Sequence, residues 1–111
     1  MKAFQPEFVL ARRRKAREKA LAQGIAALRA IEAAGGNAVL FGSVLREEDF
    51  LEGSDIEICL VKPSSFTDGW QYLPIAEEAI TDFRLDFSWL DDLRPNIRKK
   101  VETEGCGVTS F

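Results

Sequence analysis

Apolar positions in this chain follow a helical spacing near its start and alternate, as in strands, farther on. The segment from Glu7 to Ala34 is rich in helix-forming residues and contains no proline, which predicts a helix that ends at Gly35 and Gly36. Only its second half carries an apolar stripe, formed by Leu21, Ile25, Leu28 and Ile31. A straight helix of this span exceeds the expected width of the domain, so either Gly24 breaks it or its first half overhangs.

The first half of this predicted helix is strongly basic. Its cations are Arg12, Arg13, Arg14, Lys15, Arg17 and Lys19. A charge run on a helix is ordinarily a solvated face, and the alternative interpretation is a docking surface for an acidic partner or RNA. We therefore expect residues 1–20 to form an overhanging basic helix.

Three later segments have the pattern of short strands. The run from Asn37 to Phe41 is apolar and follows two glycines, which suits a buried strand. From Asp55 to Val61 and from Phe83 to Trp89, apolar and polar residues alternate, which suits strands with one buried face. Short helices are predicted between and after these strands, at Val44 to Phe50, Trp70 to Ile80 (entered at Pro74) and Asn96 to Glu104.

Strands that alternate with helices predict an α/β (α+β) fold, and these lengths allow only a small mixed sheet of three or four strands with helices packed on one face. The chain has 111 residues, a common size for one compact domain, so we treat 1–111 as a single domain. No apolar run approaches the length of a membrane span, and the start of the chain lacks a secretory pattern. We therefore expect a cytoplasmic protein without membrane partners.

The composition limits the chemistry available to the chain. It contains no histidine, which excludes Ser-His-Asp and Cys-His catalysis and HExxH metal sites. Cys59 and Cys106 are far apart and lack metal-type spacing, so both are expected to be small buried or half-buried residues. A formal net charge of −3 argues against nucleic acid as the main partner. Carboxylates must therefore carry any chemistry.

Acidic residues lie on the polar faces of two predicted strands. These residues are Asp55 and Glu57 in the second strand and Asp86 in the third. Like charges about 4 Å apart repel by about 4 kcal/mol at an effective dielectric of about 20, so three clustered carboxylates need a counter-charge. Mg²⁺, which prefers oxygen ligands and substrate phosphates, would supply it. The alternative is that the three acids lie apart on the solvated side of the sheet.

A glycine-serine turn, Gly42 and Ser43, separates the first predicted strand from the predicted helix after it. Such a turn presents backbone N–H groups and a hydroxyl at a helix N-terminus, where phosphate binds well. Gly-Ser alone is too common to indicate a site. Its place between a buried strand and a helix, ahead of the acids of the next strand, makes it a candidate phosphate site.

Together these features resemble the nucleotidyltransferases of the DNA polymerase beta superfamily, especially the minimal nucleotidyltransferases (MNT). Their signature is a strand ending in Gly-Ser, a gap of about ten residues, Ser-Asp-x-Asp or Ser-Asp-x-Glu on the next strand, and a third acid on a later strand. Here the matching residues are Leu40-Phe41-Gly42-Ser43, then Ser54-Asp55-Ile56-Glu57, and Asp86 within Arg84-Leu85-Asp86-Phe87. The resemblance covers about Ala38 to the C-terminus, and it implies a nucleotidyltransferase (polymerase beta-like) fold.

The resemblance implies that three acids form a catalytic metal site. Asp55, Glu57 and Asp86 would hold two Mg²⁺ ions, and Asp86 would help to deprotonate the attacking hydroxyl. The second acid is Glu57 rather than the commoner aspartate, and the gap before Asp55 is a residue longer than usual. Both features have precedents in the family, including aminoglycoside nucleotidyltransferases.

The resemblance also implies residues that bind the nucleotide donor, ATP. Gly42 would let the backbone approach the triphosphate, and Ser43 would hydrogen-bond a phosphate oxygen. Arg46 would contact phosphate, or else it is an ordinary surface arginine. Glu47 stands where the family often has glycine, and an acid near the triphosphate is expected to weaken nucleotide binding.

Stand-alone domains of this size resemble the antitoxins of MNT/HEPN toxin-antitoxin pairs, in which the MNT domain adenylylates a tyrosine of a HEPN-type toxin. The resemblance thus implies a Mg²⁺-dependent transferase that moves AMP from ATP to such a tyrosine. Two alternatives stay open. One is a weak or inactive domain that neutralises a partner by binding alone, and the other is a transferase acting on a small hydroxyl compound or RNA. The sequence leaves the oligomeric state open.

Overall fold

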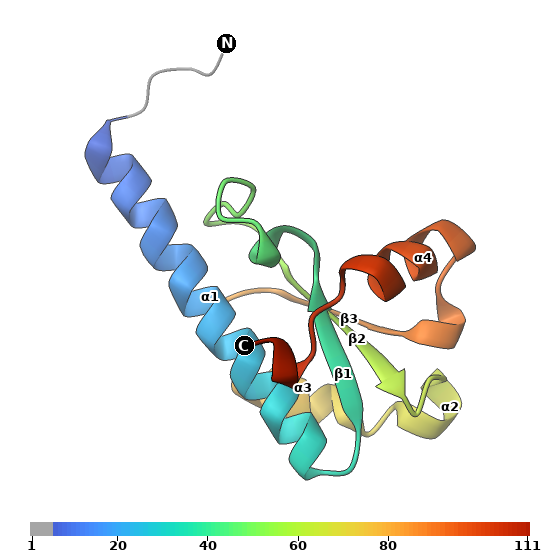
Figure 1. Cartoon of the computed structure of the whole chain (residues 1–111). Coiled ribbons are helices and arrows are strands. Elements are labelled where there is room, and N and C mark those ends of the chain that lie inside the picture. Colours follow the sequence, from blue (N-terminus) through green and yellow to red (C-terminus); the bar gives the residue numbers. More distant parts are fainter. Residues whose placement is uncertain (1–5) are drawn as a thin grey trace.

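A computed structural model describes residues 6–111 of the chain. Its helices and strands, drawn in Figure 1, are α1 (Glu7–Ala33), β1 (Asn37–Phe41), β2 (Ile56–Lys62), α2 (Phe66–Gly69), α3 (Tyr72–Ala79), β3 (Leu85–Trp89) and α4 (Pro95–Glu104). Three short 3₁₀ turns connect them or follow them: η1 (Gly42–Leu45), η2 (Leu90–Asp92) and η3 (Val108–Ser110).

The three strands form one mixed sheet in the order β1-β2-β3. The central strand, β2, is antiparallel to β1 and parallel to β3. A parallel neighbour needs a long crossover, and α2 and α3 provide it between β2 and β3. The prediction of a small mixed sheet in an α+β fold is therefore confirmed, with three strands within residues 6–111.

One face of the sheet carries the main hydrophobic core. Along β2, Ile56, Ile58 and Leu60 alternate with the residues of the other face and are fully buried. They pack with side chains of α1 and α3, such as Ile31 and Ala76. Complete burial of one such aliphatic side chain stabilises the fold by about 1.5–3 kcal/mol, so this face fixes the register of β2.

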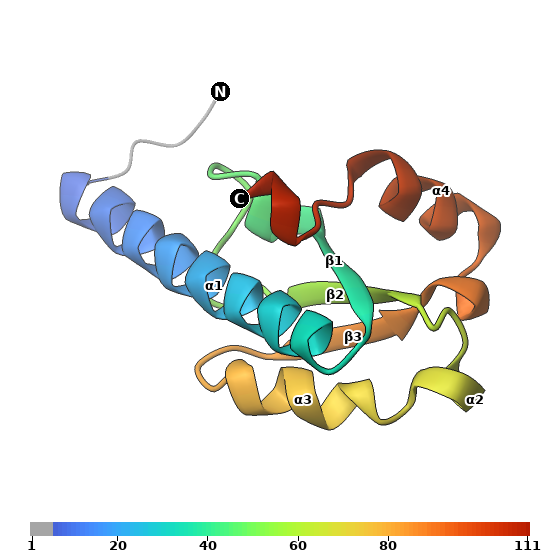
Figure 2. The same ribbon diagram turned by 60° about the horizontal axis from the view of Figure 1, so that its bottom comes forward.

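The opposite face carries a second, smaller core. Phe41 and Cys59 pack there with Leu90 and with Val101 of α4. In Figure 2, α3 and α4 accordingly lie on opposite sides of the sheet. The expectation that all helices pack on one face is therefore wrong for α4. The physical reason is that this face of β1 and β2 contains apolar side chains that need a cover, in addition to the acids.

The first helix, α1, is continuous and projects beyond the sheet at its N-terminal end (Figure 1). Gly24 does not break it. A Cβ at this position would lie 2.9 Å from Leu40 Cδ2, so glycine here allows α1 to pack closely on β1. All buried residues of α1 fall at or after Ala20. The N-terminal half thus stands away from the core, and residues 1–5 of the predicted overhang lie outside the described residues.

The prediction of a helix from Val44 to Phe50 is wrong. The turn η1 ends at Leu45, and residues 46–55 continue as loop and turns. Arg12, Arg13 and Arg14 of α1 contact this loop. Because no regular helix begins at the glycine-serine turn, the helix dipole expected there is missing.

The segment after β2 forms two short helices instead of one. Ser65 caps α2, because its hydroxyl accepts a hydrogen bond from the N–H of Asp68 at 3.3 Å. The next helix, α3, begins at Tyr72, two residues before the predicted entry at Pro74. The last helix, α4, agrees with its prediction to within one residue.

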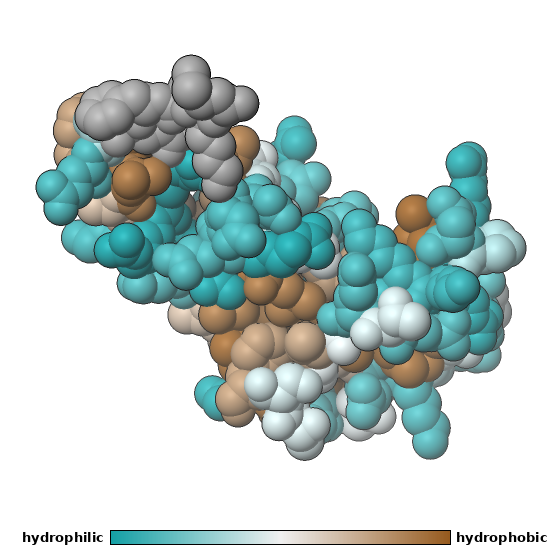
Figure 3. Space-filling view, turned by 45° about the horizontal axis from the view of Figure 1, so that its top comes forward, coloured by the Kyte–Doolittle hydropathy of each residue, from teal (hydrophilic) through white to brown (hydrophobic). Residues whose placement is uncertain are grey.

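The surface is largely hydrophilic on the side drawn in Figure 3, with an apolar area between hydrophilic regions. Within residues 6–111, no helix combines the length and the apolar character that crossing a bilayer requires. Several large apolar side chains are exposed, namely Phe8, Leu10, Leu51, Phe66, Trp70, Ile97 and Phe111.

Candidate functional site

The strand β1 leads the chain into a tight corner at Gly42. This residue has φ +81°, a left-handed conformation that favours glycine. The antiparallel register pairs Phe41 with Glu57, which brings the Glu57 side chain to the corner. A Cβ at position 42 would overlap the Glu57 carboxylate, and the backbone N–H of Ser43 acts to lower the pKa of that carboxylate. An N–H group at this corner therefore acts on an anion, and the anion is a side chain of the same molecule.

Glu57 and Asp86 face each other on neighbouring strands. The parallel register of β2 and β3 pairs them directly, and paired residues project to the same face of a sheet. The pKa of Glu57 is raised, first by burial and then by the negative charge of Asp86. The charge of Lys100 and the N–H of Ser43 act in the opposite direction. Two of the three predicted acids are thus brought together, with their repulsion only partly offset.

The third predicted acid, Asp55, lies just before β2 and two residues from Glu57. Its Oδ1 accepts a hydrogen bond from Nε of Arg84 at 3.0 Å. The Arg84 side chain is 84% exposed, so this ion pair contributes at most about 1 kcal/mol. In the part of the chain that the structure describes, no three Asp, Glu or Cys side chains form a group able to hold a metal ion. Asp55 thus pairs with Arg84, while its negative charge still adds to the raised pKa of Glu57.

Arg46, the predicted phosphate contact, follows the corner at the end of η1. Its Nε donates to Oδ2 of Asp49 at 2.5 Å. This hydrogen bond is the main cause of the raised pKa of Arg46, and the charges of Glu104 and Glu57 add to it. The guanidinium therefore lies within electrostatic reach of the corner, with Asp49 as its bound partner.

The basic half of α1 holds the loop that follows the corner. The guanidinium of Arg17 donates to the carbonyl oxygen of Val44 at 3.1 Å and to that of Leu45 at 3.4 Å. Both carbonyls belong to η1, where a helix end leaves acceptors without a partner in the helix. Arg17 thus caps η1 from a segment that is 27 residues away in sequence.

Ion pairs extend this contact along the loop. Glu47, the acid expected to weaken nucleotide binding, pairs with Arg14 at 3.5 Å, and Glu52 pairs with Arg12 at 3.1 Å. All four side chains are more than half exposed, so each pair adds little stability. The charge of Glu47 is nevertheless balanced by α1. The basic run is therefore more than a solvated face, because part of it binds the acids of this loop.

Sequence patterns do not single out Lys100, although its positive charge acts on the site. It lowers the pKa of Glu57. Val101 packs α4 against the face of the sheet that carries Glu57, and this contact brings Lys100 near the acids. The basic stretch from Arg98 to Lys100 is a weak signal in the sequence, because such runs are usually solvated.

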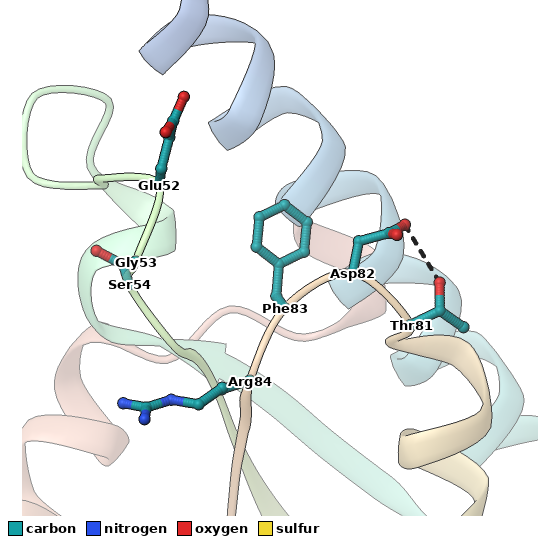
Figure 4. Close-up of a pocket in the computed structure, with 7 residues that line it drawn as sticks. All are labelled: Glu52, Gly53, Ser54, Thr81, Asp82, Phe83 and Arg84. Atoms are coloured by element: carbon teal, nitrogen blue, oxygen red, sulfur yellow. Dashed lines mark hydrogen bonds between the residues drawn. The ribbon is translucent and has the colours of Figure 1, made fainter.

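An open cleft of about 500 Å³ lies at the end of the sheet where β2 and β3 begin. Residues 52–54 and 81–84 line it, in the loops that lead into β2 and β3 (Figure 4). The ring of Phe83 stands between the two loops in this view. Arg84 lines the cleft and binds Asp55, so the cleft adjoins the ion pair two residues before Glu57 and Asp86. Glu57 and Asp86 themselves do not line the cleft.

Both cysteines are free thiols, as their spacing predicts. Cys59 is buried and Cys106 is half-buried. Burial raises the pKa of the Cys59 thiol, which keeps it protonated and unreactive at neutral pH.

No family model, curated protein or solved structure matches this chain. A function for it must therefore be argued from the residues of the corner, the paired acids and the cleft.

Proposed function

We propose that this chain is a Mg²⁺-dependent nucleotidyltransferase that moves a nucleoside monophosphate, AMP from ATP, to a hydroxyl group. The observation that carries the proposal is the pairing of Glu57 with Asp86 at the Gly42 corner, where the N–H of Ser43 acts on the Glu57 carboxylate. A site for a metal-bound phosphate needs anion-binding N–H groups beside carboxylates. Both are present here within a few residues.

Two of the three predicted acids already have an arrangement that suits Mg²⁺. Glu57 and Asp86 share one face, and their repulsion raises the pKa of Glu57. Asp55 would join them by exchanging Arg84 for the cation, and the exposed ion pair costs little to break. Mg²⁺ held by these carboxylates would neutralise phosphate charge and orient the triphosphate, with two ions on the pattern of the resemblance.

The remaining residues of the corner would bind the phosphates. With the Glu57 carboxylate on the cation, the N–H of Ser43 would be available to a phosphate oxygen, and the Ser43 hydroxyl would add a second donor. The absence of a side chain at Gly42 lets phosphate approach the backbone. Lys100 and Arg46 would balance the charge of the phosphates.

Asp86 would act on the acceptor. It is exposed, whereas Glu57 is partly buried, so an acceptor hydroxyl can reach it. Asp86 would take the proton of that hydroxyl as the oxygen attacks the α-phosphorus and pyrophosphate leaves.

For the acceptor we propose a tyrosine of a HEPN-type toxin, which would make this chain the antitoxin of a cytoplasmic pair. The cleft that adjoins the ion pair of Arg84 with Asp55 is open, whereas small ligands are usually held in enclosed pockets. An open cleft suits a hydroxyl presented by another protein. The net charge of −3 makes RNA a poorer fit.

A second candidate function is binding without catalysis. The observation that favours it is the hydrogen bond of Asp55 to Arg84, which keeps the third acid from the pair in residues 6–111. In that case the chain would neutralise its partner by contact alone.

Transfer is tested by incubating the chain, purified with its native neighbours, with α-labelled ATP and Mg²⁺. We expect label on a protein partner and an increase in that partner's intact mass by one or more nucleoside monophosphates. Asp55→Ala with Glu57→Ala should abolish the label. The matched control, Glu77→Ala with Glu78→Ala, removes the same charge from exposed positions of α3 and should leave transfer unchanged.

The possible results separate the candidates. If the Asp55→Ala, Glu57→Ala variant still neutralises the partner, binding alone suffices. Label on RNA or on a small molecule would replace the proposed acceptor and retain the transferase. If no acceptor is labelled, and ATP with Mg²⁺ leaves the melting temperature of the chain unchanged, the nucleotidyltransferase proposal is wrong.

A further inference from the structure

One edge of the sheet is covered and the other is open. On the outer edge of β1, Leu40 exchanges two backbone hydrogen bonds with Cys106, at 2.9 and 2.8 Å. On the outer edge of β3, no strand or bridge pairs with Leu85–Trp89 in the described part of the chain. β3 is therefore an edge strand with unpaired backbone groups.

The register with β2 shows which groups of β3 are open. The carbonyl of Arg84 accepts the N–H of Ile56 at 2.8 Å. In a parallel ladder, alternate residues direct their N–H and C=O groups to the neighbouring strand and the residues between them direct theirs away. The outward groups therefore belong to Leu85, Phe87 and Trp89.

This edge lacks most of the features that usually prevent edge-to-edge pairing. Natural edge strands carry charges, proline or a bulge, and of these β3 has only the charge of Asp86. Its apolar side chains, Leu85, Phe87 and Trp89, are only partly buried. Beside them, Phe66 contacts the Trp89 ring at a centroid distance of 5.0 Å and is 54% exposed, and Trp70 is 58% exposed. The edge is thus bordered by apolar surface.

The sequence of β3 is complementary to an antiparallel copy of itself. With a two-fold axis at Phe87, this residue pairs with Phe87 of the second copy, and Leu85 pairs with Trp89. Every outward backbone group of the strand then has a partner. At the positions between these pairs, Asp86 of one copy lies opposite Ser88 of the other, so no like charges meet. An axis at Asp86 would instead place two aspartates opposite each other.

We propose that β3 pairs with β3 of a second copy of this chain about the axis at Phe87. The two three-stranded sheets then form one continuous sheet of six strands. A second copy is the partner because this single register satisfies all outward groups, matches apolar with apolar residues and separates the charges. The inference concerns the outer backbone edge of β3 and does not depend on the transferase.

The pairing is tested by analytical ultracentrifugation in EDTA, together with amide hydrogen exchange followed by NMR. We expect a concentration-dependent dimer. The amide protons of Leu85, Phe87 and Trp89 should become protected as the dimer forms. Those of Asp86 and Ser88, which face β2, should be protected at every concentration. EDTA removes metal ions that would mask the charge of Asp86.

A charge at position 88 tests the register. Ser88→Asp sets an aspartate opposite Asp86 of the second copy at two symmetric positions, and we expect about tenfold weaker dimerisation. Ser88→Lys should dimerise more tightly, because it sets opposite charges together. Ser110→Asp adds the same negative charge away from β3 and should have no effect. Since the Ser88 hydroxyl donates to the Ile58 carbonyl at 3.4 Å, the neutral Ser88→Asn variant controls for loss of that bond.

Several results would overturn the proposal. One is a chain that stays monomeric up to about 1 mM, where an association of about 4 kcal/mol would be visible. Another is a dimer in which the amides of Leu85, Phe87 and Trp89 exchange as in the monomer. The third is an equal effect of Ser88→Asp and Ser88→Asn, or of Ser88→Asp and Ser110→Asp.

Discussion

At the scale of single residues, the candidate site depends on Gly42, which is constrained in two independent ways. Gly42 has a positive φ, and its missing Cβ leaves the space that the Glu57 carboxylate occupies. Gly42→Ala should therefore destabilise the fold by about 1–3 kcal/mol through backbone strain and overlap. The free energy of unfolding in urea measures this effect.

Gly53 offers a matched control for Gly42. A Cβ at position 53 meets nothing within 4 Å, and its φ is not positive. Gly53→Ala should leave stability unchanged or increase it by up to about 1 kcal/mol, because alanine restricts the unfolded chain. Equal losses in the two variants would contradict the role assigned to Gly42.

The raised pKa of Glu57 predicts a pH-dependent stability effect. Because the pKa is higher in the folded than in the unfolded chain, the stabilising contribution is complete below the unfolded pKa and is lost as the pH rises through the folded pKa. At neutral pH the ionised Glu57 is therefore unfavourable. Glu57→Gln should stabilise the fold there by at most about 1 kcal/mol, since solvent screens a partly exposed charge.

Urea unfolding at several pH values tests this prediction. The gain from Glu57→Gln should vanish in acid, where Glu57 is protonated. Glu77→Gln, at an exposed position of α3, should show no comparable gain. A stability gain that persists unchanged in acid would show that charge is not its cause.

The residue types of the site could be predicted from the sequence, but their partners could not. Local patterns identify Gly42 and place Glu57 and Asp86 on polar strand faces. The bond from Arg84 to Asp55 and the influence of Lys100 on Glu57 join segments that are far apart in sequence. Such contacts depend on packing, which residue spacing does not specify.

At the scale of elements, the strands were predicted well because the alternation of apolar and polar residues shows directly which side of a strand is buried. β1 has the predicted bounds, and β2 differs by one residue at each end. The predicted helix from Val44 to Phe50 is a short 3₁₀ turn followed by a loop, and both contact arginines of α1. A local sequence pattern does not show such contacts with a distant segment.

The contact of Arg17 with η1 predicts an effect on the loop that follows. Arg17→Met keeps most of the apolar stem and removes the charged donors to the carbonyls of Val44 and Leu45. We expect a loss of about 1.5–3 kcal/mol in the free energy of unfolding. Amide exchange in residues 46–52 should also become faster, because η1 loses its cap.

Arg12→Met is the control for this change. Its ion pair with Glu52 is exposed on both sides, so the loss should be below about 1 kcal/mol. Hydrogen exchange with mass spectrometry compares the two variants on the same peptides. If both variants loosen the loop equally, the bonds to the η1 carbonyls are not what holds it.

At the scale of the whole molecule, the fold class followed from the sequence but the strand order and the layers did not. Alternating helices and strands predict a small mixed sheet. The position of β2 in its centre depends on long-range pairing. The packing of α4 on the face opposite α1 and α3 rests on Val101, a single buried residue in a mostly polar helix. A single apolar residue does not produce an apolar stripe that could be recognised in the sequence of a helix.

The bridge between Leu40 and Cys106 predicts the outcome of shortening the chain. Deleting residues 106–111 uncovers the edge of β1, so this variant should form species larger than a dimer. Deleting residues 109–111 keeps the bridge and should leave the dimer as the largest species. Light scattering after size-exclusion chromatography distinguishes these outcomes.

The short C-terminal segment over β1 has a consequence for how many molecules can join. Because the C-terminal segment covers the outer edge of β1, each molecule has one edge strand open to pairing. A dimer formed through β3 has no open edge strand. Association therefore ends at a closed dimer, whereas two open edge strands per molecule would allow fibres of unlimited length. Two backbone hydrogen bonds between Leu40 and Cys106 thus help to keep association from continuing beyond the proposed dimer.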